Sequence, residues 1–206
     1  MDNSGVITDP GKATVSSSLF LLSRRRYTTS KQFVCKSDAG TTAWPGDSEY
    51  VWDFSGDPTQ HCSYAYHMPY DDPATGLSFV LTPASDPGLA VVADKNPHLD
   101  RTAIVTNPDF DFNPAGPSRE AKQLWNSEVH QKDGQNVAYI DSHVDFEQYS
   151  FCGINDDNIY TIGEPDTDGI AGADPVGSPP TAPTPSQPGI GPISRVDSLL
   201  VNDYKP

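Results

Sequence analysis

Acidic residues alternate with other residue types from position 164 to 168, and another follows at 174, a spacing typical of loops that wrap a calcium ion. On the EF-hand template the first three acidic residues fall at positions one, three and five, and Gly169 falls at position six. The loop departs from that template at its end, where Pro175 stands in place of the bidentate glutamate. The candidate calcium ligands are Glu164, Asp166, Asp168 and Asp174.

Calcium takes about seven oxygen ligands, so these four side chains need help from elsewhere in the chain. Asp156, Asp157 and Asn158 come shortly before the loop and are candidates for that help. The alternative is an acidic turn that is simply solvated and leads into a linker. The sequence leaves both interpretations open.

Histidines invite a metallohydrolase hypothesis, which requires two or three of them to converge with a carboxylate and leave an open position on the metal. The chain has no His-x-His and no His-Glu-x-x-His. We expect His130 instead to donate a hydrogen bond to Asp94 or Asp141 and to hold two strands in register. No Gly-x-Ser-x-Gly and no phosphate-binding glycine loop occurs, so the motifs do not indicate an enzyme.

The three cysteines allow one disulfide and leave one thiol over. A bond between Cys35 and Cys62 would close a loop of about 28 residues and stabilise the fold by about 3–4 kcal/mol in the chain-entropy model. Such a bond suits an exported protein. The alternative is three buried reduced thiols, with Cys152 among them.

Residues 137–146 predict a β-hairpin. With Asp141 and Ser142 as a two-residue turn, Tyr139 would face Val144. Because side chains alternate between the two faces of a strand, this register predicts one apolar face and one wetter face. The apolar face would hold Val137, Tyr139, Val144 and Phe146, and the wetter one Ala138, Ile140, His143 and Asp145.

Composition limits the class of protein. The chain has 206 residues, 20 prolines, 16 glycines and only 35% hydrophobic residues, which favours a loop-rich, mostly β domain. The net charge of −15 argues against nucleic acid as a partner and suits cations. No apolar run is long enough to cross a membrane as a helix, and we see no leader peptide.

The remaining patterns predict an α+β fold, in which a small antiparallel sheet packs on one or two short helices and a Pro-rich C-terminal extension follows. Helices are expected within residues 12–27, with Leu19, Phe20 and Leu22 inward, and 118–125, with Leu124 and Trp125 inward. Strands are expected at 77–82 and 89–93. The aromatic-rich segment 44–70 is interpreted as core, with a carbohydrate-stacking surface as the alternative.

The chain then divides into four parts. Residues 1–160 form the globular domain, 161–174 the acidic loop, and 175–192 an extended Pro/Gly-rich linker. Residues 193–206 regain strand character at 196–201, and we expect this tail to dock on its own sheet or on a neighbouring subunit.

The hairpin region resembles the "H-x9-D-G" signature of prepilin-type, pseudopilin-like bacterial proteins. The matching residues include His130, Asn136, Asp141 and His143, together with Gly134, Val137 and Val144. Ten residues, 131–140, separate the histidine from the aspartate instead of nine, and Ser142 replaces the family glycine. Segments 33–38 and 63–66 are similar to the family's "Cys-Pro-Ser-Asp" and "Ser-Tyr-x-Tyr" stretches.

The resemblance covers roughly residues 19–150 and implies a non-enzymatic, structural subunit of a secretion system or extracellular filament. It implies an extracellular, cell-surface or periplasmic location and other copies or other pseudopilin-like subunits as partners. Some family members bind calcium in an acidic C-terminal loop, which residues 164–174 resemble. The alternatives are an extracellular module that binds glycans or cell-wall polysaccharide and, less favoured, a metal-dependent hydrolase.

Overall fold

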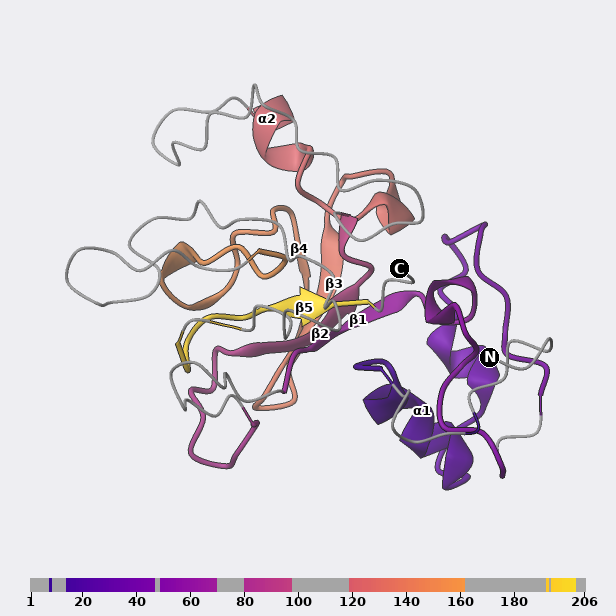
Figure 1. Cartoon of the computed structure of the whole chain (residues 1–206). Helices are drawn as coiled ribbons and strands as arrows, with labels where there is room; N and C mark the ends of the chain where they lie inside the picture. The colour runs from indigo at the N-terminus through magenta and orange to yellow at the C-terminus, as the bar shows by residue number, and fades with distance from the viewer. Residues whose placement is uncertain are drawn as a thin grey trace, which may run out of the picture.

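The protein is a small α+β fold built on one antiparallel sheet, as the sequence predicts (Figure 1). The computed structural model describes residues 8, 14–46, 49–69, 80–97, 119–161, 192 and 194–202. The strands, in the spatial order β4-β3-β2-β1-β5, are β4 (Val144–Glu147), β3 (Gln135–Tyr139), β2 (Ala90–Asp94), β1 (Tyr64–His67) and β5 (Leu200–Val201). The helices are α1 (Ser17–Arg24) and α2 (Arg119–Gln123), with 3₁₀ turns η2 (Ser30–Phe33), η3 (Pro58–Gln60), η5 (Glu128–His130) and η6 (Ile154–Asp156).

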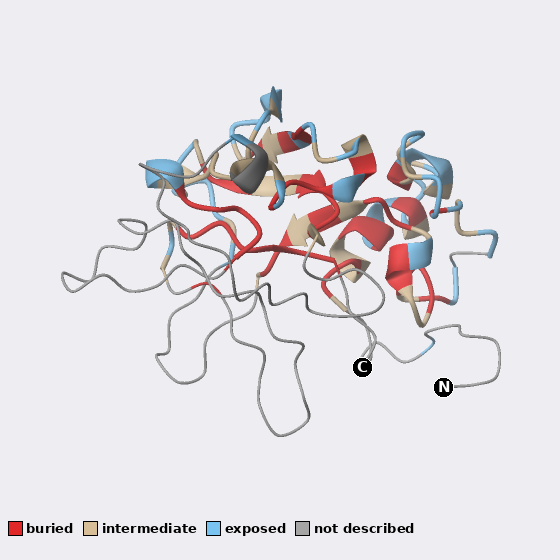
Figure 2. Ribbon diagram, turned by 90° about the horizontal axis from the view of Figure 1, so that it is seen from above, coloured by how far each residue is buried: buried red, intermediate tan, exposed pale blue. Residues whose placement is uncertain are grey.

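The sheet buries side chains on both faces. Figure 2 colours many residues of the strands and of the segments beside them as buried. On one face, small residues of the central strands leave room for the large rings and aliphatic groups of the segment around Tyr160. This cluster comprises Ala65, Ala90, Ala93, Val137, Tyr139, Ile159, Tyr160 and Leu200. The other face carries Tyr64, Tyr66 and Val92, which pack against the α1 region.

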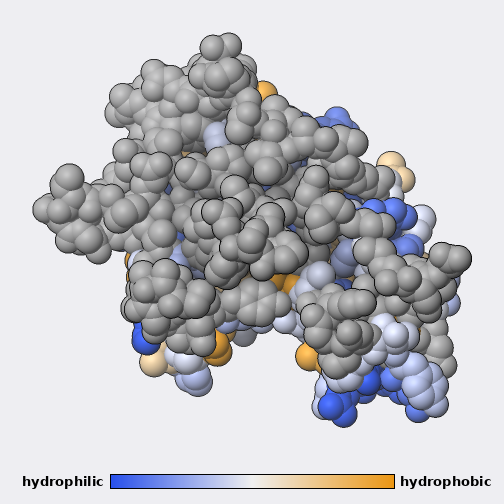
Figure 3. All heavy atoms as spheres, viewed as in Figure 1, coloured by the Kyte–Doolittle hydropathy of each residue, from blue (hydrophilic) through white to orange (hydrophobic). Residues whose placement is uncertain are grey.

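Helix α1 is shorter than the predicted range 12–27. Leu19, Phe20 and Ser23 are buried, while Leu22, which was expected inward, is 44% exposed. The helix is held at its start by Asp53, whose carboxylate accepts hydrogen bonds from the Ser16 hydroxyl (2.8 Å) and from the Thr14 backbone amide (3.0 Å). Hydrophilic side chains gather at the α1 end of the molecule (Figure 3).

The aromatic segment 44–70 contributes mainly to the core. Phe54 is completely buried and packs edge-to-face on Phe20 and Phe33, with ring centroids 5.0 Å apart in both pairs. Trp52 lies under the Arg24 guanidinium, 3.6 Å from the ring centroid, which is a cation–π contact at the end of α1. Tyr50 is the exception at 74% exposed, and Tyr70 lies outside the described residues.

The prediction of strands in residues 77–93 was half right. The run 89–93 matches the central strand β2 (Ala90–Asp94) to within one residue at each end, and this strand is hydrogen-bonded on both sides. Residues 80–82 have no strand structure, and residues 77–79 lie outside the described part of the chain. In the region of α2, Trp125 is buried as predicted, whereas Leu124 is 47% exposed and does not point inward.

The β3–β4 hairpin is present, but its predicted register was wrong by one residue. Val137 pairs with Asp145 and Ala138 with Val144, and the Tyr139 amide donates to the His143 carbonyl. The loop therefore has three residues, 140–142, and ends at Ser142 with φ of 77°. A three-residue loop that ends in the left-handed region is a common hairpin connection.

A slip of one residue moves a strand's side chains to the opposite face. The predicted apolar face is therefore split between the two sides of the sheet. Val137 and Tyr139 are buried, whereas Val144 is 62% exposed and Phe146 is 52% exposed. The residues predicted on the wetter face are also split between the two sides of the sheet, since Asp145 pairs with Val137.

The C-terminal tail docks on the protein's own sheet, one of the two predicted outcomes. Strand β5 pairs antiparallel with β1, and Leu199, Leu200 and Val201 are all buried. Except for residue 192, the Pro/Gly-rich segment 175–192 lies outside the described residues. None of the described helices is long and apolar enough to cross a membrane.

Candidate functional site

Three segments that are far apart in the sequence bring Cys35, Asp94 and His130 together. Within the described residues, their ligand-type atoms form a group in which every pair lies within 4.8 Å. His130 Nε2 lies 3.3 Å from Asp94 Oδ2 and 3.9 Å from Cys35 Sγ. We call this group the Cys35/Asp94/His130 cluster.

Asp94 is placed by the central strand. It is the last residue of β2 and lies opposite Tyr64 of β1. On the other side, the backbone amide of Asn136 on β3 donates to Asp94 Oδ2 at 2.7 Å, and the Asn136 side-chain amide donates to the same oxygen at 3.2 Å. Strand β3 therefore fixes the carboxylate, and the pairing with β1 fixes the backbone that carries it.

His130 is placed by the 3₁₀ turn η5. Ser127 caps this turn by accepting a hydrogen bond from the Val129 amide, and Gln131 after it adopts a left-handed conformation (φ 58°). The imidazole packs edge-to-face on Phe146 of β4, with ring centroids 5.8 Å apart. The Asn136 side-chain nitrogen lies 3.0 Å from His130 Nε2.

Cys35 follows η2 and is anchored through a chain of polar groups. Its backbone amide donates to the Ser63 hydroxyl (3.0 Å), and Ser63 in turn donates to Asp38 Oδ2 (2.9 Å). Lys95, the residue after Asp94, forms an ion pair of 2.8 Å with Asp38. Burial acts to raise the pKa of Asp38, but hydrogen bonds from Lys95, Thr41 and Ser63 and the Lys95 charge lower it below its ordinary value.

The environment of Asp94 is unusual for a carboxylate, because the residue has no exposed surface. Burial raises its pKa above the ordinary value, opposed by the hydrogen bonds from Asn136 and by the nearby imidazole. Oδ2 accepts both Asn136 hydrogen bonds, while Oδ1 has no hydrogen-bond partner in the described part of the protein. A buried polar atom without a partner is rare and calls for an explanation.

The cluster does not have the arrangement of a nucleophilic triad. In such a triad the imidazole contacts the nucleophile through one ring nitrogen and the orienting carboxylate through the other. Here Cys35 Sγ and Asp94 Oδ2 both approach the same nitrogen, His130 Nε2. Three ligand-type atoms thus converge on one point, which is the arrangement expected of metal ligands.

The signature residues from the sequence separate into two groups. His130 and Asn136 belong to the cluster, and Asp94 is the one of the two predicted His130 partners that the structure shows. Asp141, the other predicted partner, pairs instead with His143 at 2.5 Å in the exposed hairpin loop. The His143 ring also stacks on Tyr139, with centroids 4.3 Å apart.

The predicted disulfide does not form. All three cysteines lie in the described part of the chain, and none of them is disulfide-bonded. Cys62 is buried in the α1-side core, and Cys35 turns toward His130. Burial raises the pKa of the Cys152 thiol to about 12, so that residue stays a neutral thiol at physiological pH.

The candidate calcium loop cannot be placed, because Glu164, Asp166, Asp168 and Asp174 lie outside the described residues. Of the residues expected to assist it, Asp157 is buried, and its Oδ2 accepts a hydrogen bond from the Ser198 amide at 2.9 Å. Burial and the nearby Asp197 charge raise the pKa of Asp157 well above its ordinary value.

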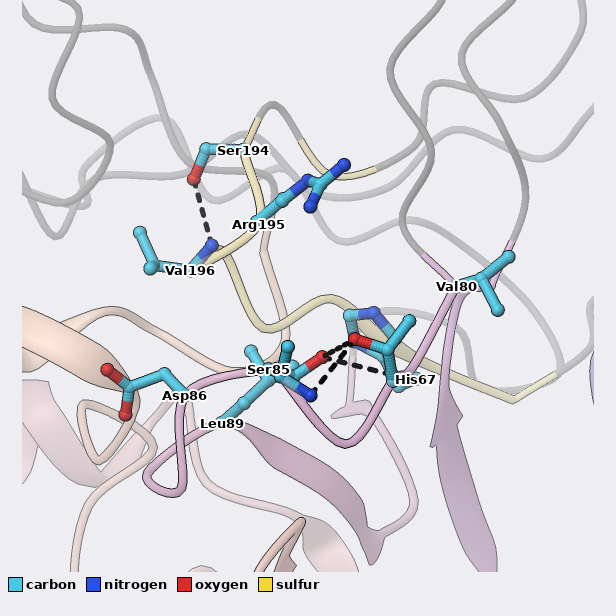
Figure 4. A pocket seen from close by; sticks show the side chains of 10 residues that line it. His67, Val80, Ser85, Asp86, Leu89, Ser194, Arg195 and Val196 are labelled. Atoms are coloured by element: carbon cyan, nitrogen blue, oxygen red, sulfur yellow. Dashed lines mark hydrogen bonds between the residues drawn. The ribbon is translucent and has the colours of Figure 1, made fainter.

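A separate cavity of about 310 Å³ contains a serine, a histidine and an aspartate (Figure 4). These residues do not form a catalytic group there. The Ser85 hydroxyl accepts a hydrogen bond from the Thr82 amide (3.1 Å), and Asp86 accepts one from the Gly88 amide (2.9 Å). Figure 4 shows the Asp86 carboxylate pointing away from the His67 ring.

No family model matches this chain, and comparison with curated proteins and with solved structures finds no match either. The site is therefore interpreted from its own geometry.

Sequence reasoning found part of the cluster. It named Asp94 as one of two possible partners of His130. It considered Cys35 for a disulfide, as a reduced thiol and within the family-like segment 33–38, but not beside His130, and it missed Asp38 and Lys95 as supporting groups. The available signal was the charged pair Asp94-Lys95 directly after the apolar run of β2, which places two ionisable groups at the end of a central strand.

Proposed function

We propose that the protein is a non-enzymatic structural subunit of a pseudopilin-like secretion or extracellular filament assembly. The observation that carries this proposal is the apolar surface of β4, one of the two edge strands of the sheet. Val144 and Phe146 expose 62% and 52% of their surface there, next to a strand edge that no other described strand covers. Exposed apolar edge strands are natural sites for pairing with another chain.

The role of the signature residues supports the same proposal. His130 and Asn136 connect the hairpin to β2 and to the Cys35 segment through short contacts. They fix the framework that presents β4, which is what a subunit needs when its function is to assemble. The proposed partners are other copies of the chain or other pseudopilin-like subunits, at an extracellular, cell-surface or periplasmic location.

Photo-crosslinking tests this proposal in cells that produce the full chain. A crosslinking residue at position 144 or 146 is expected to give covalent products with another copy or with another pseudopilin-like subunit. The same residue at exposed position 86, outside the sheet, serves as the control. Equal yields at position 86 and at the β4 positions, or no product at β4, would contradict the proposal.

The glycan-binding alternative is less well supported. It needs coplanar exposed rings, whereas Phe54 is buried and Trp44, Tyr64 and Tyr66 pack against the α1-side core.

The candidate calcium loop is a second element of the proposal, in which Ca²⁺ stabilises the exported subunit. Calcium at a hundredfold excess over its Kd should stabilise the fold by about 2.7 kcal/mol. A thermal melt with calcium and with chelator should therefore show a rise of several degrees, lost in the double variant Asp166→Ala/Asp168→Ala. An unchanged melting temperature in the wild type would remove calcium from the proposed function.

A further inference from the structure

We propose that the Cys35/Asp94/His130 cluster is a binding site for a transition-metal ion of the Zn²⁺ type. This inference is independent of the assembly role, because it rests on the geometry of three side chains and not on any partner. The site also differs from the proposed calcium loop in the residues that form it and in ligand chemistry.

The distances within the cluster suit a tetrahedral ion. With bonds of about 2.0–2.2 Å to nitrogen and oxygen and about 2.3 Å to sulfur, neighbouring ligands of tetrahedral Zn²⁺ lie about 3.3–3.8 Å apart. His130 Nε2 lies 3.3 Å from Asp94 Oδ2 and 3.9 Å from Cys35 Sγ. Two of the three distances are therefore close to the edges of such a tetrahedron, and the third, between the cysteine sulfur and the carboxylate, is within 4.8 Å.

The burial of Asp94 is the second, independent observation. The carboxylate is completely buried, and its Oδ1 has no hydrogen-bond partner among the described residues. A metal ion would compensate the buried negative charge of Asp94. The His130 imidazole, which is partly exposed, compensates that charge only in part.

The donor set indicates the class of metal. A thiolate and an imidazole favour Zn²⁺ and related first-row ions over Ca²⁺ or Mg²⁺, which prefer ligands that are all oxygen. Asn136 would act as a positioning residue, since its backbone and side-chain amides both donate to Asp94 Oδ2. Its side-chain nitrogen also lies 3.0 Å from His130 Nε2, a contact that a bound ion would replace. Such outer contacts orient a ligand and commonly change metal affinity by about 10–100-fold.

A fourth ligand would come from a cavity that lies beside the cluster and is lined by neighbours of the three ligands, not by the ligands themselves. The segments that follow Cys35 and Asp94, and the two residues before His130, line a second cavity of about 310 Å³. Asp38 and Lys95 both line that cavity. The ion pair between them compensates the positive charge of Lys95, which would otherwise repel a metal ion nearby. A water molecule from this cavity would complete the tetrahedron.

Zinc content tests the inference on the full chain. The protein is kept reduced, dialysed against Zn²⁺ and then against metal-free buffer, and its zinc is measured by mass spectrometry. We expect one zinc per chain in the wild type, and affinity at least about 100-fold weaker in Cys35→Ser and in His130→Gln. The matched controls Cys62→Ser and His143→Gln should keep the ion, as should Asp166→Ala/Asp168→Ala.

Cobalt gives a second readout, which the wild type alone can already provide. Co²⁺ bound by a cysteine thiolate shows a sulfur-to-metal charge-transfer absorption, which we expect in the wild type and in Cys62→Ser but not in Cys35→Ser. Lack of zinc binding, lack of that absorption in the wild type, or equal loss in the control variants would overturn the proposal.

Discussion

Two aspartate–histidine pairs in this protein use the same chemistry in opposite surroundings. In the Asp94–His130 pair the aspartate side chain is completely buried and the histidine is 23% exposed. In the Asp141–His143 pair, on the hairpin loop, the side chains are 44% and 46% exposed. The first pair connects β2, β3 and the Cys35 segment, whereas the second connects residues only two positions apart.

The difference shows that burial decides what such a pair contributes. Water screens the exposed pair, so its attraction adds little to stability. At Asp94 the carboxylate has lost its hydration, and every remaining contact must compensate for that loss. The pKa shifts of the two aspartates fit this difference. Burial raises the pKa of Asp94, whereas hydrogen bonds from the His143 amide and ring lower the pKa of Asp141.

Removal of each aspartate is the most direct way to break this comparison. Asp94→Ala should lower the free energy of unfolding by about 3–5 kcal/mol, because it leaves the Asn136 amide groups and His130 without their partner. Asp141→Ala is the matched control and should have a much smaller effect. Urea unfolding measures both, and equal losses would mean that burial does not distinguish the pairs.

A second test disturbs the framework that joins the two regions. Gly134 precedes β3 with φ of 155°, and a Cβ added there would lie 2.4 Å from the Glu147 carbonyl oxygen and 2.7 Å from the Phe146 ring. Gly134→Ala should therefore destabilise the protein by about 2–3 kcal/mol and loosen the hairpin. Amide hydrogen exchange should show lost protection in β3 and β4, and unchanged protection there would contradict the structure.

A third test asks whether another buried carboxylate behaves like Asp94. The pKa of Asp157 is raised by burial and by Asp197, so the folded state holds a proton that the unfolded state releases near pH 3.8. The stability that protonated Asp157 contributes is therefore complete below pH 3.8 and falls as the pH rises through the folded-state pKa. At higher pH that contribution stays lost.

Asp157→Asn removes this titration while its amide oxygen can still accept the Ser198 hydrogen bond. The variant should be more stable than the wild type near neutral pH by about 1 kcal/mol, and the difference should shrink toward pH 3.8. Urea unfolding across a pH series measures it. A constant difference at all pH values would show that the carboxylate charge is not responsible.

The smallest effect on stability is expected at Ser142, which lies between Asp141 and His143 of the exposed pair. Ser142 has φ of 77°, a conformation that glycine adopts without the strain that a side chain brings. Ser142→Gly should raise stability by about 0.5–1 kcal/mol, seen as a higher melting temperature. The parallel change Ser150→Gly, at a buried residue with negative φ, should not stabilise the protein.

The elements were easier to predict than their exact positions. The run 89–93 and the alternation on both sides of residues 140–142 were enough to predict β2 and the hairpin, because local periodicity reports strands directly. The register was missed because Asp141-Ser142 suggests a two-residue turn, while the actual loop also includes Ile140. In α1, the packing of the neighbouring aromatic core leaves Leu22 outside.

The sequence alone determined the fold class, the existence of the hairpin and tail strands, and the pairing of His130 with one of two aspartates. These features follow from local patterns of apolar residues, turn residues and charge. The tertiary structure decided which aspartate pairs with His130, that Cys35 joins them instead of bonding to Cys62, and that Val144 and Phe146 face outward. Such outcomes depend on how separate segments cross in space, and in a strand a shift of one residue reverses which side chains meet.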